Sequence, residues 1–215
     1  MPTPLERYRR CLEDGSIRPD PAQAQVIERL NTLALELVQR QHTPWWRSLG
    51  RRRDPGPKGL YLWGGVGRGK TWMMDLFFDS LPFEDKIRIH FHRFMARVHE
   101  ALREHESSSD PLPVIARHWA KHHPVLCFDE FFVSDIADAM LLGGLLEALF
   151  ERGVTLVATS NVEPRDLYRH GLQRSRFLPA IAAIERHTDV LHVGGDTDHR
   201  LRLLERSEIY HHPLD

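Results

Sequence analysis

The sequence has few cysteines, almost no net charge and no long apolar run, and each shortage excludes a class of protein. Two cysteines in 215 residues, Cys11 and Cys127, argue against a secreted domain held together by disulfides. The formal net charge of -1 leaves no overall field that would attract the chain to nucleic acid or to anionic lipid. The amino-terminal residues are polar and do not resemble a secretory signal. A cytoplasmic protein is therefore expected.

A membrane-spanning helix and a metal site built only from protein side chains are not expected either. The longest apolar run, AMLLGGLLEALF, is too short to cross a bilayer and contains Glu147. The 14 histidines show no HExxH pattern and no other zinc spacing. Basic residues do cluster between Arg47 and Lys58, where they indicate either a solvated loop or a local contact with nucleic acid.

Strand and helix patterns alternate along most of the chain. Apolar, strand-like runs occupy residues 60–63, 87–91, 124–131, 154–161 and 189–193. Helical patterns occupy residues 21–40, 70–81, 94–106, 114–122, 136–151, 166–168 and 178–185. Strands that are apolar on both faces and alternate with helices are typical of a parallel sheet covered on each side. The sequence therefore predicts an α/β fold, with residues 1–56 as an amino-terminal helical segment and linker, and residues 57–215 as the nucleotide-binding core.

A glycine-rich segment between the first predicted strand and the next helix has the pattern G-x-x-x-x-G-K-T of a P-loop. Glycines allow backbone N–H groups to approach phosphates closely, and the free N–H groups at the start of the next helix attract the same negative charge. Lys70 is expected to reach the β- and γ-phosphates, and the Thr71 hydroxyl to ligate Mg²⁺. The predicted binding residues are Gly64, Gly65, Val66, Gly67, Arg68, Gly69, Lys70 and Thr71.

Polar residues that follow later strands are candidates for the chemistry of hydrolysis. Asp129 and Glu130 end the apolar run VLCFDE, where Asp129 is expected to hold Mg²⁺ and Glu130 to polarise an attacking water. Asn161 follows the strand VTLVATS, and its amide can donate and accept hydrogen bonds at once. Arg174 and Arg176 precede an apolar helix, and arginine can stabilise the charge on a transferring phosphoryl group. Each signal taken alone also fits a polar strand end or a solvated surface.

Five segments together closely resemble the ZapE/AFG1-like AAA+ ATPases, and the resemblance covers nearly the whole chain. The segments are GLYLWGGVGRGKT, HFHRFM, LCFDEFFVSDIADAMLL, VATSN and LYRHGLQRSRFLPAI. HFHRFM and GLQRSRFLP are more discriminating than the P-loop, which many unrelated NTPases share. The resemblance implies that Lys70 and Thr71 belong to Walker A, and that Asp129 and Glu130 belong to Walker B. It also implies that Asn161 is sensor 1 and that Arg174, or else Arg176, is the arginine finger.

The resemblance also implies properties of the whole protein. These are a sheet in the order 5-1-4-3-2, ATP and Mg²⁺ as cofactors, homo-oligomeric rings with shared sites, and a protein client moved by hydrolysis. The implied client is the bacterial division-ring tubulin homologue. Members of the family are considerably longer, so a carboxy-terminal lid is expected to be absent. Two alternatives stay open: a nucleic-acid-handling module of the helicase-loader type, and a nucleotide-dependent interaction switch with little turnover.

Overall fold

The computed structural model of the protein describes residues 1–41, 56–106 and 108–194. Its strands form one parallel sheet in the order β2-β3-β4-β1-β5, which confirms the predicted fold class and strand order. The strands are β1 (Gly59–Trp63), β2 (Lys86–His90), β3 (Val125–Asp129), β4 (Thr155–Ser160) and β5 (Thr188–His192). The helices are α1 (Pro4–Glu13), α2 (Pro21–Gln41), α3 (Lys70–Phe78), α4 (Phe91–Glu104), α5 (Leu112–His122), α6 (Ile136–Phe150) and α7 (Leu178–His187), with short 3₁₀ helices η2 (Pro164–Asp166) and η3 (Arg174–Arg176).

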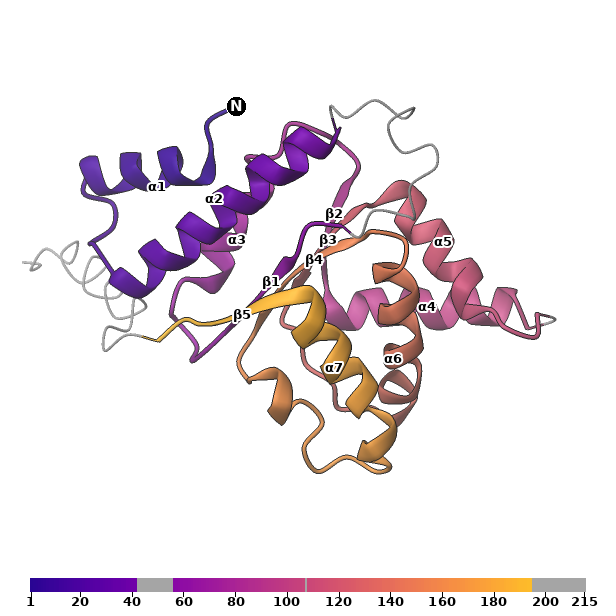
Figure 1. Ribbon diagram of the computed structural model, residues 1–215. Coiled ribbons are helices and arrows are strands. Elements are labelled where there is room, and N and C mark those ends of the chain that lie inside the picture. The colour runs from indigo at the N-terminus through magenta and orange to yellow at the C-terminus, as the bar shows by residue number, and fades with distance from the viewer. Residues whose placement is uncertain (42–55, 107, 195–215) are drawn as a thin grey trace, which may run out of the picture.

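Helices cover both faces of the sheet, so the molecule has three layers (Figure 1). Helices α1, α2 and α3 share one apolar core with the sheet, and helices α4 to α7 share the other. Strand β3 supplies both cores, since Val125 and Cys127 enter the first and Leu126 and Phe128 enter the second. Side chains of a strand point alternately to the two faces, so a central strand between two helical layers is apolar throughout.

Helix α1 was not predicted, although its first turn has a recognisable capping box. Thr3 Oγ1 accepts a hydrogen bond from Glu6 N at 3.3 Å, and Glu6 Oε2 accepts one from Thr3 N at 2.8 Å. Pro4 stands in the first turn, where the missing N–H is not needed. Tyr8 is buried, with its ring 6.2 Å from that of Trp72 on α3. Helix α1 is therefore packed beside the helix that follows the glycine-rich loop.

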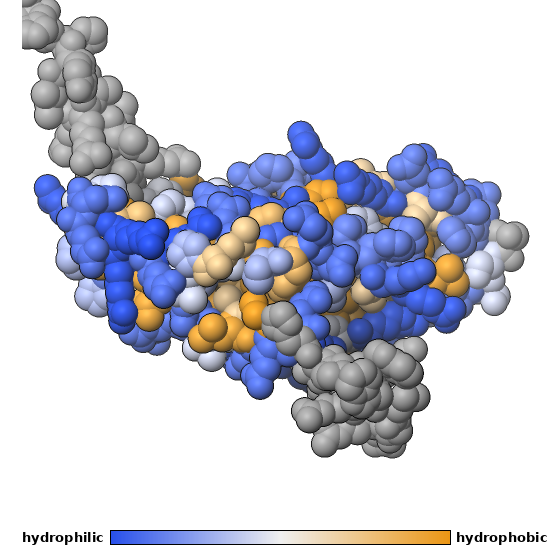
Figure 2. Space-filling model, turned by 90° about the horizontal axis from the view of Figure 1, so that it is seen from above, coloured by the Kyte–Doolittle hydropathy of each residue, from blue (hydrophilic) through white to orange (hydrophobic). Residues whose placement is uncertain are grey.

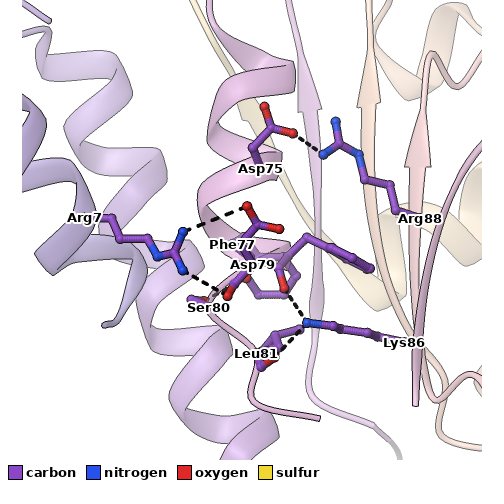
Figure 3. A network of polar contacts seen from close by, with 9 residues as sticks. Arg7, Asp75, Phe77, Asp79, Ser80, Leu81, Lys86 and Arg88 are labelled. Atoms are coloured by element: carbon purple, nitrogen blue, oxygen red, sulfur yellow. Dashed lines mark hydrogen bonds and ion pairs between the residues drawn. The ribbon is translucent and has the colours of Figure 1, made fainter. Parts of the chain in front are cut away.

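Several predicted helices have different bounds in the structure, and α4 begins at Phe91, three residues earlier than predicted. Helix α3 ends at Phe78, earlier than predicted, and its last carbonyl accepts a hydrogen bond at 2.7 Å from Lys86 Nζ of β2. The same ammonium donates to the carbonyl oxygen of Leu81 (Figure 3). The helix predicted over 166–168 is instead the 3₁₀ turn η2 at Pro164–Asp166. Tyr168 has a φ of 53°, which lies in the left-handed region and cannot continue a right-handed helix.

Charged side chains fix helix α2 to the edge strand β5. Arg29 Nε donates to Asp189 Oδ2 at 2.7 Å, and Lys58 Nζ lies 2.9 Å from Asp189 Oδ1. Burial favours the neutral carboxyl, but the hydrogen bonds from Lys58 and Arg29 outweigh it, so the pKa of Asp189 is lowered. This edge of the sheet is therefore held by ion pairs in addition to apolar packing.

The face of the molecule seen in Figure 2 is mostly polar. Seen from above, hydrophilic residues dominate and apolar residues lie in small groups between them (Figure 2). Within the described ranges, no helix is long and apolar enough to cross a membrane. In the same ranges, no three or more His, Cys, Asp or Glu side chains gather where they could hold a metal ion.

Candidate functional site

The carboxyl ends of three adjacent strands bring together most of the predicted site residues. Strands β3, β4 and β1 are neighbours and run parallel, so all three end at the same edge of the sheet. Strand β1 leads into the glycine-rich loop 64–69, β3 ends at Asp129, and β4 ends at Ser160. Open parallel sheets bind their ligands outside this edge. The site predicted from distant segments of the sequence thus lies at one place in the fold.

The loop between β1 and α3 has a backbone conformation that requires glycine. Gly64, Gly67 and Gly69 have φ angles of 147°, 81° and 82°. A Cβ atom on Gly64 would lie 2.5 Å from the carbonyl oxygen of Val193, and one on Gly69 would lie 3.0 Å from Gln23 Nε2. The glycines therefore serve both the turn itself and the close approach of neighbouring segments.

The start of helix α2 supports this loop from one side. Asp20 Oδ1 accepts hydrogen bonds from Ala22 N at 2.9 Å and Gln23 N at 3.3 Å, so the segment DPAQ begins a helix. Gln23 is buried, and its Nε2 donates to the carbonyl oxygen of Arg68 at 3.2 Å. No sequence pattern predicted this support of the loop. Gln23 is therefore a further residue of the site.

Lys70 joins the loop to the end of β4. Its buried ammonium donates to Gly64 O at 2.8 Å, to Gly65 O at 2.7 Å and to Asn161 Oδ1 at 3.2 Å. Residues 91 positions apart in the sequence thus meet through their side chains. Thr71, the second residue of α3, is exposed beside them. The predicted lysine and the predicted amide therefore belong to one cluster.

The segment after β3 turns sharply and fixes the position of Glu130. This residue has a φ of 55°, although it is not glycine, and it is exposed. Its backbone N–H donates to Thr159 Oγ1 at 3.3 Å, and the next N–H, of Phe131, donates to Thr159 O at 2.7 Å. Ser160 Oγ donates to Phe131 O at 2.7 Å. These contacts with the end of β4 hold Glu130 in the left-handed conformation. Such strained residues cluster at functional sites.

Asp129 pairs with an arginine that sequence reasoning missed. Arg88, in the middle of β2, donates from Nε to Asp129 Oδ2 at 2.7 Å and from Nη2 to Asp129 Oδ1 at 3.3 Å. Its Nη1 is hydrogen-bonded and ion-paired to Asp75 of α3 (Figure 3). Burial disfavours the charged guanidinium, but the hydrogen bonds to Asp129 and Asp75 outweigh it and raise the pKa of Arg88. One cation thus links the end of β3 to the helix of the P-loop.

The two candidate arginine fingers lie on η3, apart from these contacts. Arg174 Nη2 donates to the carbonyl oxygen of Arg165 at 2.6 Å, and its buried Nε has no hydrogen-bond partner among the described residues. Arg176 Nη1 donates to Gln173 Oε1 at 3.1 Å and is exposed. The structure therefore brings Lys70 and Asn161 together but does not bring either arginine to them.

Two further sequence features cannot be placed. Most of the basic cluster between Arg47 and Lys58 lies at residues 47–55, outside the described residues, so the interpretation as a nucleic-acid contact lies there too. The carboxy-terminal stretch from residue 195 onward is also outside them. The site is therefore built from residues 20–23 and 64–71, from the ends of β3 and β4, and from Arg88.

Comparison with known proteins identifies a family and a shared fold. The family model described as AFG1-like ATPase matches residues 2–215. The chain is 51% identical over 227 aligned residues to the cell division protein ZapE of Escherichia coli (strain K12), covering 99% of this chain and 60% of ZapE. Domain III of the replication initiation protein DnaA from Thermotoga maritima is similar in structure, with a TM-score of 0.57, 17% identity and coverage of 93% of this chain and 74% of that chain.

The crystal structure of DnaI is also similar. It has a TM-score of 0.55 and 18% identity, and it covers 86% of this chain and 87% of that one. Identities this low show a shared fold and nothing about the ligand. The likeness therefore shows a shared fold alone, whereas the match to the family model and to ZapE shows membership of a family.

Proposed function

The chain belongs to the AFG1-like ATPase family, and we propose that it binds ATP with Mg²⁺ at residues 64–71 and hydrolyses the nucleotide. It spans 60% of the length of ZapE, so the activity proposed for this chain must rest on its own residues. The observation that carries the proposal is the contact of 3.2 Å between Lys70 Nζ and Asn161 Oδ1. This contact unites the loop after β1 with the end of β4, where phosphate binding and water activation both need to occur.

The glycine-rich loop suits a triphosphate by its backbone and its charge. In the described structure, Lys70 Nζ donates to the carbonyl oxygens of Gly64 and Gly65 and to an amide oxygen. The ammonium of Lys70 binds a phosphate oxygen more strongly than a neutral carbonyl or amide oxygen, because the phosphate oxygen carries the opposite charge. We therefore assign the β- and γ-phosphates to Lys70 and to the backbone N–H groups of residues 64–71.

The oxygen donors at the site fit Mg²⁺. Mg²⁺ prefers hydroxyl, carboxylate and water oxygens, and the site offers the exposed Thr71 hydroxyl and the Asp129 carboxylate. When bound, Mg²⁺ would neutralise part of the negative charge on the phosphates. Glu130 is proposed to accept a proton from the attacking water, since its exposed carboxylate follows Asp129 directly. Asn161 is proposed to orient that water while it contacts Lys70.

The remaining roles concern the assembly and its client. We assign the arginine finger to Arg174, acting on the nucleotide of a neighbouring subunit in a homo-oligomeric ring. The buried Nε of Arg174 has no partner among the described residues, and the side chain does not reach the site of its own chain. By its similarity to a cell division protein, the chain is proposed to act in cell division on a protein client, the division-ring tubulin homologue.

Nucleotide binding and phosphate release test the proposal directly. Lys70→Ala is expected to weaken ATP binding by about 10- to 100-fold, since a charge-assisted hydrogen bond contributes about 1.5–3 kcal/mol. The matched control is Lys121→Ala, which removes an exposed lysine of α5 on the other face of the sheet. Equal ATP binding by all three proteins would refute the assignment of the loop.

Concentration dependence separates turnover from a switch. A phosphate-release rate per subunit that rises with protein concentration is expected, because Arg174 would complete the site of a neighbour. Arg174→Ala is expected to remove this rise without changing ATP binding. ATP binding with no phosphate release at any concentration would favour the nucleotide-dependent switch over an ATPase.

A further inference from the structure

Arg88 connects two parts of the proposed site that the sequence places far apart. Its guanidinium forks onto both oxygens of Asp129, at 2.7 Å and 3.3 Å, and its third nitrogen contacts Asp75. Asp75 lies one helical turn beyond Thr71 on α3. The two residues assigned to Mg²⁺, Thr71 and Asp129, therefore stand on elements that one arginine joins.

The position of Arg88 follows from the pairing of β2 with β3. Arg88 lies opposite Cys127, and Asp129 is two residues further along β3, so both side chains point to the same face of the sheet. That face is covered by α3, because Cys127 belongs to the core shared with α3. A long side chain on β2 thus reaches the end of β3 and the middle of α3 at once.

The hydrogen bonds of Arg88 limit how the Asp129 carboxylate can turn. Asp129 is buried, and a carboxylate has about four lone-pair sites, of which the fork of Arg88 occupies two. The remaining lone pairs then have a fixed direction. A guanidinium can hold both oxygens in this way because its donors are planar and rigid, whereas a lysine ammonium acts as a single point of charge.

We propose that Arg88 is a positioning residue for magnesium: it sets the orientation of Asp129 and its separation from the P-loop helix through Asp75. This inference rests on the proposed function, since it concerns the metal that accompanies the nucleotide. Groups that hold metal ligands in place typically change metal affinity by 10- to 100-fold when they are replaced. In this proposal Arg88 acts through Asp129 and Asp75.

The test measures metal dependence apart from hydrolysis. A fluorescent, non-hydrolysable ATP analogue is titrated onto the full chain at increasing Mg²⁺ concentration, and the binding of Mn²⁺ with the same analogue is followed by electron paramagnetic resonance. Arg88→Lys keeps the charge but removes the fork, and it is expected to raise the half-saturating Mg²⁺ concentration by about 10-fold. Its affinity for the analogue in excess chelator is expected to equal that of the parent.

Asp75→Ala provides an independent variant, because the side chain of Asp75 is 47% exposed and its loss leaves the fork onto Asp129 in place. It is expected to shift the Mg²⁺ dependence in the same direction. The matched control is Asp79→Ala, which removes another carboxylate next to α3, one that pairs with Arg7 at 3.9 Å (Figure 3). The control is expected to keep the parental Mg²⁺ dependence.

Each outcome decides the inference. Parental or tighter Mg²⁺ dependence in Arg88→Lys would overturn it, and tighter dependence would show that Arg88 competes with the metal instead. A shift in Arg88→Lys without one in Asp75→Ala would overturn the link to α3. If circular dichroism shows that Arg88→Lys is unfolded, Asp75→Ala alone decides. Failure of the proposed function would give a different result from failure of this inference. In that case Lys70→Ala would bind the analogue with the same affinity as the parent protein does.

Discussion

Replacing Glu130 with glycine is expected to stabilise the protein and to abolish ATP hydrolysis. The φ angle of Glu130 is 55°, and the left-handed region costs a residue with a Cβ atom about 1–2 kcal/mol. Glycine removes this cost but loses about 0.5–1 kcal/mol more conformational entropy on folding. The expected net gain is therefore about 0.5–1 kcal/mol. For a chain of this length, that gain corresponds to a rise in Tm of about 1–4 °C.

A second variant separates the backbone effect from the chemistry. Glu130→Gln keeps the shape of the side chain and the strained backbone but removes the basic carboxylate. Its Tm and ATP affinity are expected to equal those of the parent, because Glu130 is exposed. Its phosphate-release rate is expected to fall by about 10²- to 10⁴-fold, the usual contribution of a general base. Melting followed by circular dichroism and a phosphate-release assay measure the two effects.

The control for the backbone effect is Gln173→Gly. Gln173 is exposed and has a φ of 56°, so glycine there is expected to raise the Tm by a similar amount. A higher Tm for Gln173→Gly with an unchanged or lower Tm for Glu130→Gly would refute the argument from strain. Parental hydrolysis by Glu130→Gln would show that this carboxylate is not the base.

Three further predictions concern the thiols, the acid side of the stability curve and the support of the loop. At about pH 8 a thiol reagent is expected to label Cys11 but not Cys127 in the native protein, because burial raises the pKa of Cys127 to about 12. Labelling of both cysteines without denaturant would contradict this prediction. The folded-state pKa of Asp189 is depressed, so its stabilising contribution is complete above the unfolded pKa of 3.8 and is lost as the pH falls through the folded pKa. Asp189→Asn is therefore expected to flatten the decline in the free energy of urea unfolding below about pH 4. A decline as steep as that of the parent would refute this prediction. Gln23→Ala is expected to lower the Tm by about 2–4 °C through loss of about 1 kcal/mol of hydrogen bonding, whereas the exposed neighbour variant Gln25→Ala is expected to melt like the parent.

The features predicted well are those that a short stretch of sequence encodes. The glycine-rich loop with a strand before it and a helix after it is a local pattern, and the structure has both elements at the predicted places. The strand order came from the family resemblance, since periodicity alone does not specify which strands are neighbours. The capping box at Thr3 and Glu6 is equally local, and this pattern predicts the start of α1.

The features missed depend on contacts between distant segments. The link from Arg88 to Asp129 needs the register of β2 against β3, and no sequence pattern sets that register. The local signal was the alternation of two cations, Lys86 and Arg88, with isoleucines in the strand KIRIH. The support of Arg68 by Gln23 likewise depends on how α2 packs beside the loop. The roles assigned to Glu130 and to the arginines of η3 stay predictions.

The alternation of cations and isoleucines along strand β2 favours the correct register of this strand during folding. Lys86 and Arg88 are two residues apart and face α3, where they bind the carbonyl of Phe78 and the carboxylate of Asp75, while Ile87 and Ile89 face the opposite layer. A slip of one residue along β3 would turn both cations into an apolar core. Misaligned pairing of this edge strand is therefore disfavoured by the free-energy cost of burying two charges. Electrostatics thus helps to select the correct register of β2 in the sheet.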